Sequence, residues 1–184
     1  MAKKIVILNG SPRPRGNTAL LCDAFADGAK NAGHDVRIFN LEKMKIGGCV
    51  GCMKGGKDFK SPCVIKDDMD QIYPAYEEAD IVVLASPMYY WSISGQLKTA
   101  FDRLFAVAEC YPDYANPAKN CVLIMAAEGD SPENWKPALD YYHSLVGFLK
   151  WTNLGEILAG GVLDAGAVAS SPGIEAARKL GQSL

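Results

Sequence analysis

The sequence predicts one α/β domain in which five parallel strands form an open, doubly wound sheet, in the order 2-1-3-4-5, with helices on both faces. Short apolar runs alternate with helical periods five times along the 184 residues. Most of these runs are apolar on both faces, which is typical of parallel strands covered from both sides. No repeat, low-complexity tract or domain boundary interrupts the alternation, so we expect a single domain over residues 1–184.

The strands are expected where the apolar runs lie. The first, third and fourth are the continuous runs 5–8, 81–85 and 122–125, and the fifth is the less regular stretch 157–162. The second, 36–39, carries a charged arginine in its middle, as an edge strand can. We therefore place it at one edge of the sheet.

Helices are expected between the strands. The periodicity and the end signals predict helices over 17–32, from 67 or 68 to 78, over 93–108 and over 132–149. In the third of these, Asp102 and Arg103 belong to the polar face, where we expect a solvated ion pair. A short helical stretch near the end, 174–180, is expected to cover the first or the third strand. The segment 45–66, rich in Gly, Lys and Cys, is expected to be a long loop at the rim.

The composition excludes several classes of protein. With 19 Lys and Arg against 21 Asp and Glu, the net charge is -2, and no basic block is longer than a pair. Binding to nucleic acid or to an anionic membrane is therefore not expected. The apolar run near the start ends at Leu8, and the longest later run is 121–127, both too short for a signal peptide core or a membrane span. We expect a cytoplasmic protein whose cysteines are thiols, cluster ligands or redox groups.

The loop after the first expected strand, 9–18, combines the features of a phosphate cradle. Glycines free its backbone, and the helix that follows points N–H groups and its positive dipole end at the same place. The side chains concerned are Ser11, Asn17 and Thr18, with the charge of Arg13 or Arg15 beside them. Gly10 and Gly16 do not have the spacing of a dinucleotide fingerprint, and no lysine makes the loop a Walker A motif. A polar turn with a good helix cap is the alternative.

The loop after the third expected strand holds three consecutive aromatic residues, Tyr89, Tyr90 and Trp91. Three neighbouring aromatic side chains cannot all face a core, and they suit the flat face of a planar ligand. A contact between subunits is the alternative, and both can hold together. The loop 127–131 brings a flexible glycine to the same rim.

Together these loops resemble the flavodoxin-like NAD(P)H-dependent FMN reductase family, over about residues 3 to 165. The motifs that carry the resemblance are Gly10-Ser11-Pro12-Arg13 with Gly16-Asn17-Thr18, Ser86-Pro87-Met88-Tyr89-Tyr90-Trp91-Ser92 with Gly95-Gln96-Leu97-Lys98, and Phe101-Asp102-Arg103. The sequence also looks like the iron–sulfur flavoprotein branch, through Cys49-Val50-Gly51-Cys52 and the stretch 63–69.

The resemblance implies a flavodoxin-like domain that binds FMN. By position, it implies that the phosphate is held by Ser11, Arg13, Asn17 and Thr18. It places the edge and face of the isoalloxazine along Pro87, Met88, Tyr89, Tyr90, Trp91 and Ser92, with Glu128, Gly129 and Asp130 near the other side of the ring. It implies a hydride transfer from NADPH or NADH to the flavin, followed by reduction of flavin, a quinone or a similar electron-poor acceptor. We expect no catalytic side chain, because the flavin carries the chemistry.

The alternative function is an electron-transfer flavoprotein, either a flavodoxin-like carrier or an iron–sulfur flavoprotein, that passes electrons to a protein partner. A carrier typically needs a surface of one sign to steer docking, and a net charge of -2 provides little of it. For the reductase we expect a small-molecule acceptor and a homodimer, with a tetramer as the alternative. The sequence leaves open the physiological acceptor and the choice between NADH and NADPH.

The cysteines raise a separate question. Iron–sulfur flavoproteins carry a compact run of four cysteines, in which two residues separate the second from the third, and this sequence has Gly55 at the third position. Cys49, Cys52 and Cys63 are one thiolate short of the four that a [4Fe–4S] cluster ordinarily takes. We therefore assign no metal site. A loop that has lost its metal, a redox pair of Cys49 and Cys52, and a cluster or zinc site completed by another ligand stay as alternatives.

Overall fold

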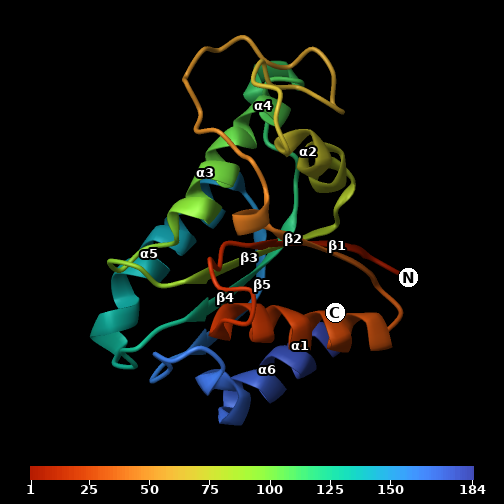
Figure 1. The fold of residues 1–184 in the computed structure, drawn as a ribbon. Coiled ribbons are helices and arrows are strands. Elements are labelled where there is room, and N and C mark those ends of the chain that lie inside the picture. The colour runs from red at the N-terminus through yellow and green to blue at the C-terminus, as the bar shows by residue number, and fades with distance from the viewer.

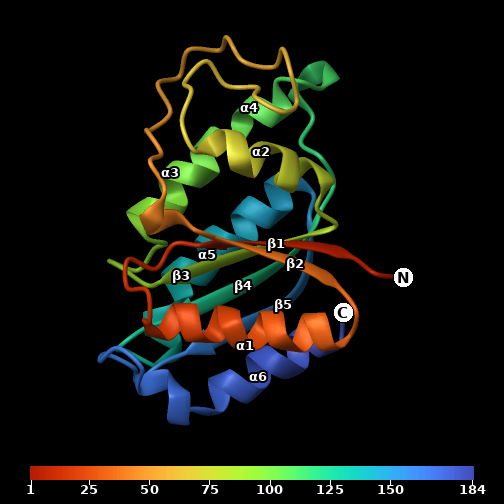
Figure 2. The same ribbon diagram turned by 45° about the vertical axis from the view of Figure 1, so that its right-hand side comes forward.

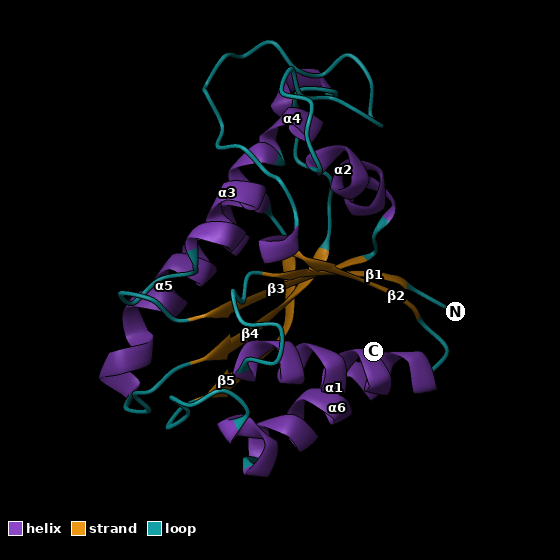
Figure 3. Ribbon diagram, viewed as in Figure 1, coloured by secondary structure: helices purple, strands orange, loops and turns teal.

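Five parallel strands form one sheet in the computed structural model, which describes residues 1–184. The order is β2-β1-β3-β4-β5, as predicted (Figure 3). The strands are β1 (Lys4–Asn9), β2 (Asp35–Asn40), β3 (Ile81–Pro87), β4 (Asn120–Ala126) and β5 (Thr152–Ala159). The prediction for the fifth strand was displaced towards the C-terminus: the strand begins at Thr152 and ends before Gly160. The strand begins with two exposed polar residues, Thr152 and Asn153, at an edge of the sheet, so its start carries no apolar signal.

Helices cover both faces of the sheet (Figures 1 and 2). One face carries α1 (Asn17–Asn31) and α6 (Pro172–Gln182), and the other carries α2 (Met69–Glu78), α3 (Gly95–Arg103), α4 (Phe105–Ala108) and α5 (Pro132–Leu149). None of the helices is both long and apolar enough to cross a membrane.

The apolar runs of the strands supply two cores because successive side chains point to opposite faces. In β1, Ile5 and Ile7 pack beneath α1, whereas Val6 and Leu8 pack with α2, α3 and α5. All four side chains are buried. This division is the physical reason why the strands are apolar at every position rather than at alternate ones.

The helix expected over 93–108 is interrupted at Leu104 and forms two helices, α3 and α4. Its start is well specified, because the hydroxyl of Ser94 accepts a hydrogen bond from the backbone N–H of Leu97 at 3.3 Å. The expectation of a solvated Arg103 was wrong: only 1% of this residue is exposed. Its partners belong to the long loop between β2 and α2, which the helical periodicity could not reveal.

The C-terminal helix α6 packs against α1 and β5 instead of covering β1 or β3. Two glycines permit this close approach. A Cβ atom at Gly28 of α1 would lie 2.0 Å from the carbonyl oxygen of Arg178, and one at Gly181 of α6 would lie 2.2 Å from that of Phe25. The long loop, 44–68, contains no helix or strand and lies near α2 and α4 (Figures 1 and 2).

Candidate functional site

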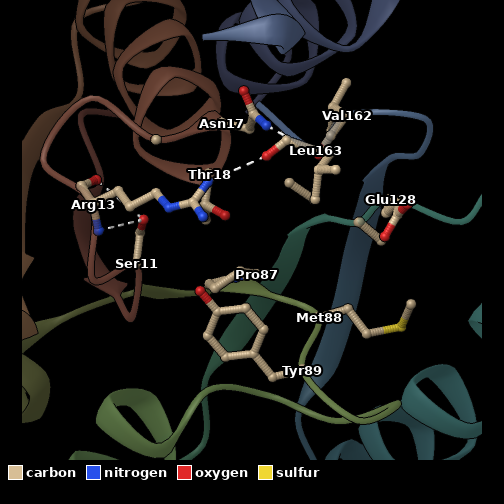
Figure 4. Close-up of a pocket in the computed structure, with 13 residues that line it drawn as sticks. Ser11, Arg13, Asn17, Thr18, Pro87, Met88, Tyr89, Glu128, Val162 and Leu163 are labelled. Carbon is tan, nitrogen blue, oxygen red and sulfur yellow. Dashed lines mark hydrogen bonds between the residues drawn. The ribbon is translucent and has the colours of Figure 1, made fainter. Parts of the chain in front are cut away.

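A pocket of about 210 Å³ opens at the carboxyl edge of the sheet (Figure 4). Ligands of open parallel sheets bind at this edge. The predicted site residues that line it are Ser11, Arg13, Asn17, Thr18, Pro87, Met88, Tyr89 and Glu128. They come from the loops after β1, β3 and β4, and Val162 and Leu163 from the loop after β5 complete the wall.

The start of α1 forms one end of the pocket and leaves its first N–H groups free. No side chain caps this helix, so the alternative of an ordinary capped turn does not hold. The backbone N–H groups of Asn17, Thr18 and Ala19 have no acceptor within the chain. A Cβ atom at Gly16 would lie 2.9 Å from the Ser11 hydroxyl, so glycine keeps the loop tight around these groups. Free N–H groups at a helix start are a site for an anion.

Thr18 and Asn17 contribute to this end of the pocket in different ways. Thr18 is only 1% exposed, and its hydroxyl makes no hydrogen bond within the chain although it borders the pocket. The side-chain nitrogen of Asn17 donates to the carbonyl oxygens of Val162 at 3.1 Å and Asp164 at 3.0 Å, and its oxygen accepts from the N–H of Val168 at 3.1 Å. The Asn17 side chain therefore positions the loop after β5, and its backbone N–H is the group left for a ligand.

Arg13 extends across the pocket towards the loop after β5 (Figure 4). Its guanidinium donates one hydrogen bond, from Nη1 to the carbonyl oxygen of Leu163 at 3.2 Å. The hydroxyl of Ser11 accepts from the Arg13 N–H at 3.3 Å and lies 3.2 Å from the Arg13 carbonyl oxygen, to which it donates. The loop is thus held by Ser11, while the cation of Arg13 stays available to a ligand.

The aromatic loop after β3 divides between the pocket and its rim. Tyr89 lines the pocket, whereas Tyr90 and Trp91 do not and are 95% and 56% exposed. Tyr89 and Ser92 exchange two backbone hydrogen bonds of 3.0 Å, which closes a two-residue turn. Within it, Tyr90 and Trp91 have φ values of 48° and 59°, a conformation unfavourable for bulky residues. Such local strain is found where a loop is shaped for function.

The remaining predicted residues, Ser92, Gly129 and Asp130, do not line the pocket. Asp130 accepts a hydrogen bond from Nε1 of Trp135 at 3.2 Å, and Gly129 packs against the side chain of Asn134. These residues shape the loop after β4, of which Ala127 and Glu128 line the pocket.

Ser94 does not line the pocket but connects two of the loops that do, and the sequence analysis assigned it no role. It is fully buried, and its hydroxyl donates to the Gly10 carbonyl oxygen at 2.8 Å. Its N–H donates to the hydroxyl of Ser86 at 2.7 Å, so it joins the loops after β1 and β3. A Cβ atom at Gly10 would come within 2.5 Å of the Ser94 hydroxyl, which explains why position 10 has no room for a side chain. The position of Ser94 directly before a helix was the one available signal.

A second cavity lies beneath the long loop, and Cys49, Cys52 and Cys63 all line it. Arg103 also lines this cavity and holds the loop in place. Its guanidinium donates to the Gly47 carbonyl oxygen at 2.7 Å, to the Ile65 carbonyl oxygen at 3.1 Å and to both carboxylate oxygens of Asp67 at 2.7 and 3.2 Å. Partial burial opposes ionisation of Asp67, but these hydrogen bonds outweigh it and hold its pKa below the ordinary value.

No three Cys, His, Asp or Glu side chains lie close enough together to share a single metal ion. All six cysteines are free thiols, and Cys22 and Cys121 are buried among the core residues. Burial raises the pKa of both of these thiols. Cys49, Cys52 and Cys63 of the long loop line the cavity described above.

The family model for NADPH-dependent FMN reductases matches residues 3–159 of the chain. An iron–sulfur flavoprotein of Archaeoglobus fulgidus is 41% identical over 101 residues, which are 55% of this chain and 45% of that protein. The chain spans about half the length of the curated iron–sulfur flavoproteins that it matches.

Solved structures share the fold over the whole chain. The NAD(P)H:quinone oxidoreductase from Methanothermobacter marburgensis superimposes with a TM-score of 0.77 at 16% identity, covering 100% of this chain and 96% of that one. An azoreductase from Bacillus anthracis superimposes with a TM-score of 0.72 at 21% identity, covering 100% of both chains. At these identities the likeness concerns the fold.

Proposed function

Because the chain belongs to the NADPH-dependent FMN reductase family, we propose that it binds FMN in the pocket at the carboxyl edge and transfers electrons from NADPH or NADH to a small acceptor. The acceptor class that we infer is a flavin, a quinone or a similar electron-poor compound. The observation that carries the proposal is the convergence of free N–H groups, an unpaired hydroxyl and a cation at the start of α1.

These groups fit the phosphate of FMN. The N–H groups of Asn17, Thr18 and Ala19 and the hydroxyl of Thr18 are hydrogen-bond donors without acceptors in the chain. Arg13 can leave the Leu163 carbonyl and give the phosphate a charge-assisted hydrogen bond. Gly16 keeps the loop close to the helix start, where a Cβ atom would fill the space.

The loops after β3 and β4 lie where the ring system would extend. Pro87, Met88 and Tyr89 form one wall, and Glu128 lies at the other side. When bound, FMN supplies the redox chemistry by accepting a hydride and passing two electrons on, so the protein's part is to bind and orient it. We assign no catalytic side chain.

We also infer a homodimer in which the 89–92 turn meets the second copy. Tyr90 and Trp91 are exposed aromatic side chains beside the opening of the pocket. Tyrosine and tryptophan are enriched at the cores of protein interfaces. Covering them would bury apolar surface and would restrict access of water to the pocket.

The reductase is tested by anaerobic mixing of the FMN-loaded protein with NADPH and, separately, with NADH. We expect rapid loss of the flavin absorbance with at least one of them, and its return when a quinone or free flavin is added. Photochemical reduction of the same sample provides the control that the flavin can be reduced. A flavin that is reduced by light but does not respond to either nicotinamide would contradict the reductase and favour an electron carrier.

A further inference from the structure

The long loop, 44–68, concentrates positive charge on a chain whose net charge is -2. It holds five of the 19 basic residues, all of them exposed: Lys45, Lys54, Lys57, Lys60 and Lys66. None of these lysines forms an ion pair within the chain. Their charge is therefore available to a partner.

The acidic residues of the loop do little to offset this charge. Asp67 is bound by Arg103 at 2.7 Å, and Asp68 accepts a hydrogen bond from a backbone N–H at 2.7 Å, both at the base of the loop. In the outer part, 50–64, Asp58 is the one acidic residue. The outer part thus presents three lysines against a single carboxylate.

Exposed apolar side chains lie between these lysines. Val50, Met53 and Val64 are 68%, 58% and 46% exposed, and Phe59 is 40% exposed. Met53 also has a φ of 51°, a conformation unfavourable for a residue with a side chain. Folding of the chain therefore does not explain why these positions are apolar. Clustered exposed apolar residues mark a site of contact with a protein or a membrane.

The loop rises beyond α2 and α4, where its outer part is open to solvent (Figures 1 and 2). Its backbone is nevertheless held at several points. The Arg103 guanidinium binds the base of the loop, and the Gly55 N–H donates to Oε2 of Glu109 at 3.1 Å. The Gly56 N–H donates to the carbonyl oxygen of Pro62 at 3.0 Å. A surface that is already formed loses less conformational entropy when it binds.

We propose that the outer part of the long loop, 50–64, is a docking surface for an anionic lipid membrane. Lysines are attracted to a negatively charged lipid surface, and apolar side chains between them enter the headgroup region. All the cations of the loop are lysines. Because protein interfaces are depleted in lysine and enriched in arginine, this composition favours a membrane over an acidic protein.

Membrane binding was not expected from the sequence, because no basic run is longer than a pair. Lys54, Lys57 and Lys60 are three residues apart and escape that criterion. Electrostatic attraction acts over about 10 Å at 0.1 M salt, so lysines on one loop act together without being adjacent in sequence. No residue of the loop lines the proposed flavin pocket, so the docking surface does not depend on FMN binding.

The test is co-sedimentation of the purified protein with lipid vesicles. Vesicles of phosphatidylcholine with about one third phosphatidylglycerol are compared with vesicles of phosphatidylcholine alone, at about 0.1 M salt. We expect binding to the anionic vesicles and not to the neutral ones. Binding should be lost at about 0.5 M salt, because salt screens the attraction.

The role of the lysines is tested by Lys54→Gln combined with Lys57→Gln. Binding to anionic vesicles should weaken about 25-fold, because each lysine near such a surface contributes a factor of about five. Lys30→Gln combined with Lys150→Gln is the matched control, because it removes the same charge from exposed lysines near the ends of α1 and α5. The control should bind within about twofold of the wild type.

The role of the apolar side chains is tested by Val50→Ser combined with Met53→Ser, which leaves every charge in place. Binding should weaken about tenfold, because the serines cannot enter the headgroup region as favourably. Phe148→Ser removes an exposed aromatic residue from α5 and should bind as the wild type does. Circular dichroism confirms the fold of each variant, and FMN content reports separately on the flavin pocket.

The outcomes decide the proposal in both directions. A wild type that binds neither kind of vesicle overturns it, and so does a Lys54→Gln, Lys57→Gln variant that binds as well as its control. Undiminished binding by Val50→Ser, Met53→Ser overturns the insertion of apolar side chains. Retention of the wild type on immobilised polyglutamate, without binding to vesicles, would overturn the membrane and assign the loop to an acidic protein partner.

Discussion

Arg13 and Thr18 offer the pocket hydrogen-bonding groups that the chain itself uses little. The Arg13 guanidinium makes one hydrogen bond, to a backbone carbonyl, and the Thr18 hydroxyl makes none. Asn17, which has the same polar character in the sequence, uses its whole side chain to hold the loop after β5. The hydrogen-bond partners thus distinguish side chains that stay available to a ligand from a side chain that positions a neighbouring loop.

Replacement of Arg13 by alanine is expected to weaken FMN binding about 10- to 100-fold, because a charge-assisted hydrogen bond contributes about 1.5–3 kcal/mol. The measurement is the Kd for FMN, from quenching of flavin fluorescence on titration of the apoprotein. Arg15→Ala is the matched control, because Arg15 carries the same charge in the same loop but does not line the pocket. Equal weakening by both substitutions would contradict the assignment of Arg13.

The turn from Tyr89 to Ser92 is a short element whose sequence does not match its backbone. A two-residue turn with both central φ values positive ordinarily holds Asn-Gly, and here it holds Tyr90 and Trp91. A left-handed conformation costs roughly 1–2 kcal/mol for each such residue. The aromatic pair is thus retained at a cost in stability, which supports its use as a contact surface.

Substitution of Tyr90→Asn together with Trp91→Gly is expected to raise the free energy of unfolding by about 1 kcal/mol, because this pair suits the turn. The same variant should dissociate the proposed homodimer, as measured by sedimentation equilibrium of the FMN-loaded protein. Phe148→Ala is the control, because Phe148 is an exposed aromatic residue of α5 far from the turn in sequence. A dimer that persists unchanged in the double variant would contradict the proposed interface.

The two faces of the molecule are covered in different ways, and only one depends on close contact between helices. On the face of α1, the helix α6 approaches so closely that Gly28 and Gly181 each have a backbone carbonyl where a Cβ atom would be. Asn17 reinforces this packing by holding the 162–168 segment that leads to α6. The pocket therefore depends on the correct docking of the C-terminal helix, because the same segment forms one of its walls.

Gly181→Ala is expected to lower the free energy of unfolding by about 1–3 kcal/mol, because the added methyl group forces α6 away from α1. Gly147→Ala provides the matched control: Gly147 lies in α5, and a Cβ atom added there would meet no neighbouring atom within 4 Å. There the higher helix propensity of alanine should raise stability by about 0.5–1 kcal/mol. Both values come from denaturant unfolding followed by circular dichroism. A neutral Gly181→Ala would mean that the helices can separate without cost.

Much of the fold and the outline of the pocket could be predicted because their signals are local. Apolar runs on both faces, helix periods and the polar loop 9–18 are properties of neighbouring residues. The predicted position of the fifth strand was displaced because the strand begins with exposed polar residues at the edge of the sheet. The helix over 93–108 was predicted as one continuous helix because hydrophobic periodicity does not reveal the break at Leu104. Tyr90 and Trp91 lie in a turn and do not line the pocket, and the sequence could not show this because it depends on the backbone conformation of the loop.

The sequence alone determined the class of fold, the order of strands that it favours and the two loops that meet at the carboxyl edge, since these follow from short-range patterns and from the chirality of strand–helix–strand units. Tertiary structure decided the burial of Arg103, the use of Asn17 as a positioning residue and the contact of Glu109 with Gly55. The partners in each case lie tens of residues apart along the chain. Such contacts are set by how helices and loops pack on the sheet, which no local pattern encodes.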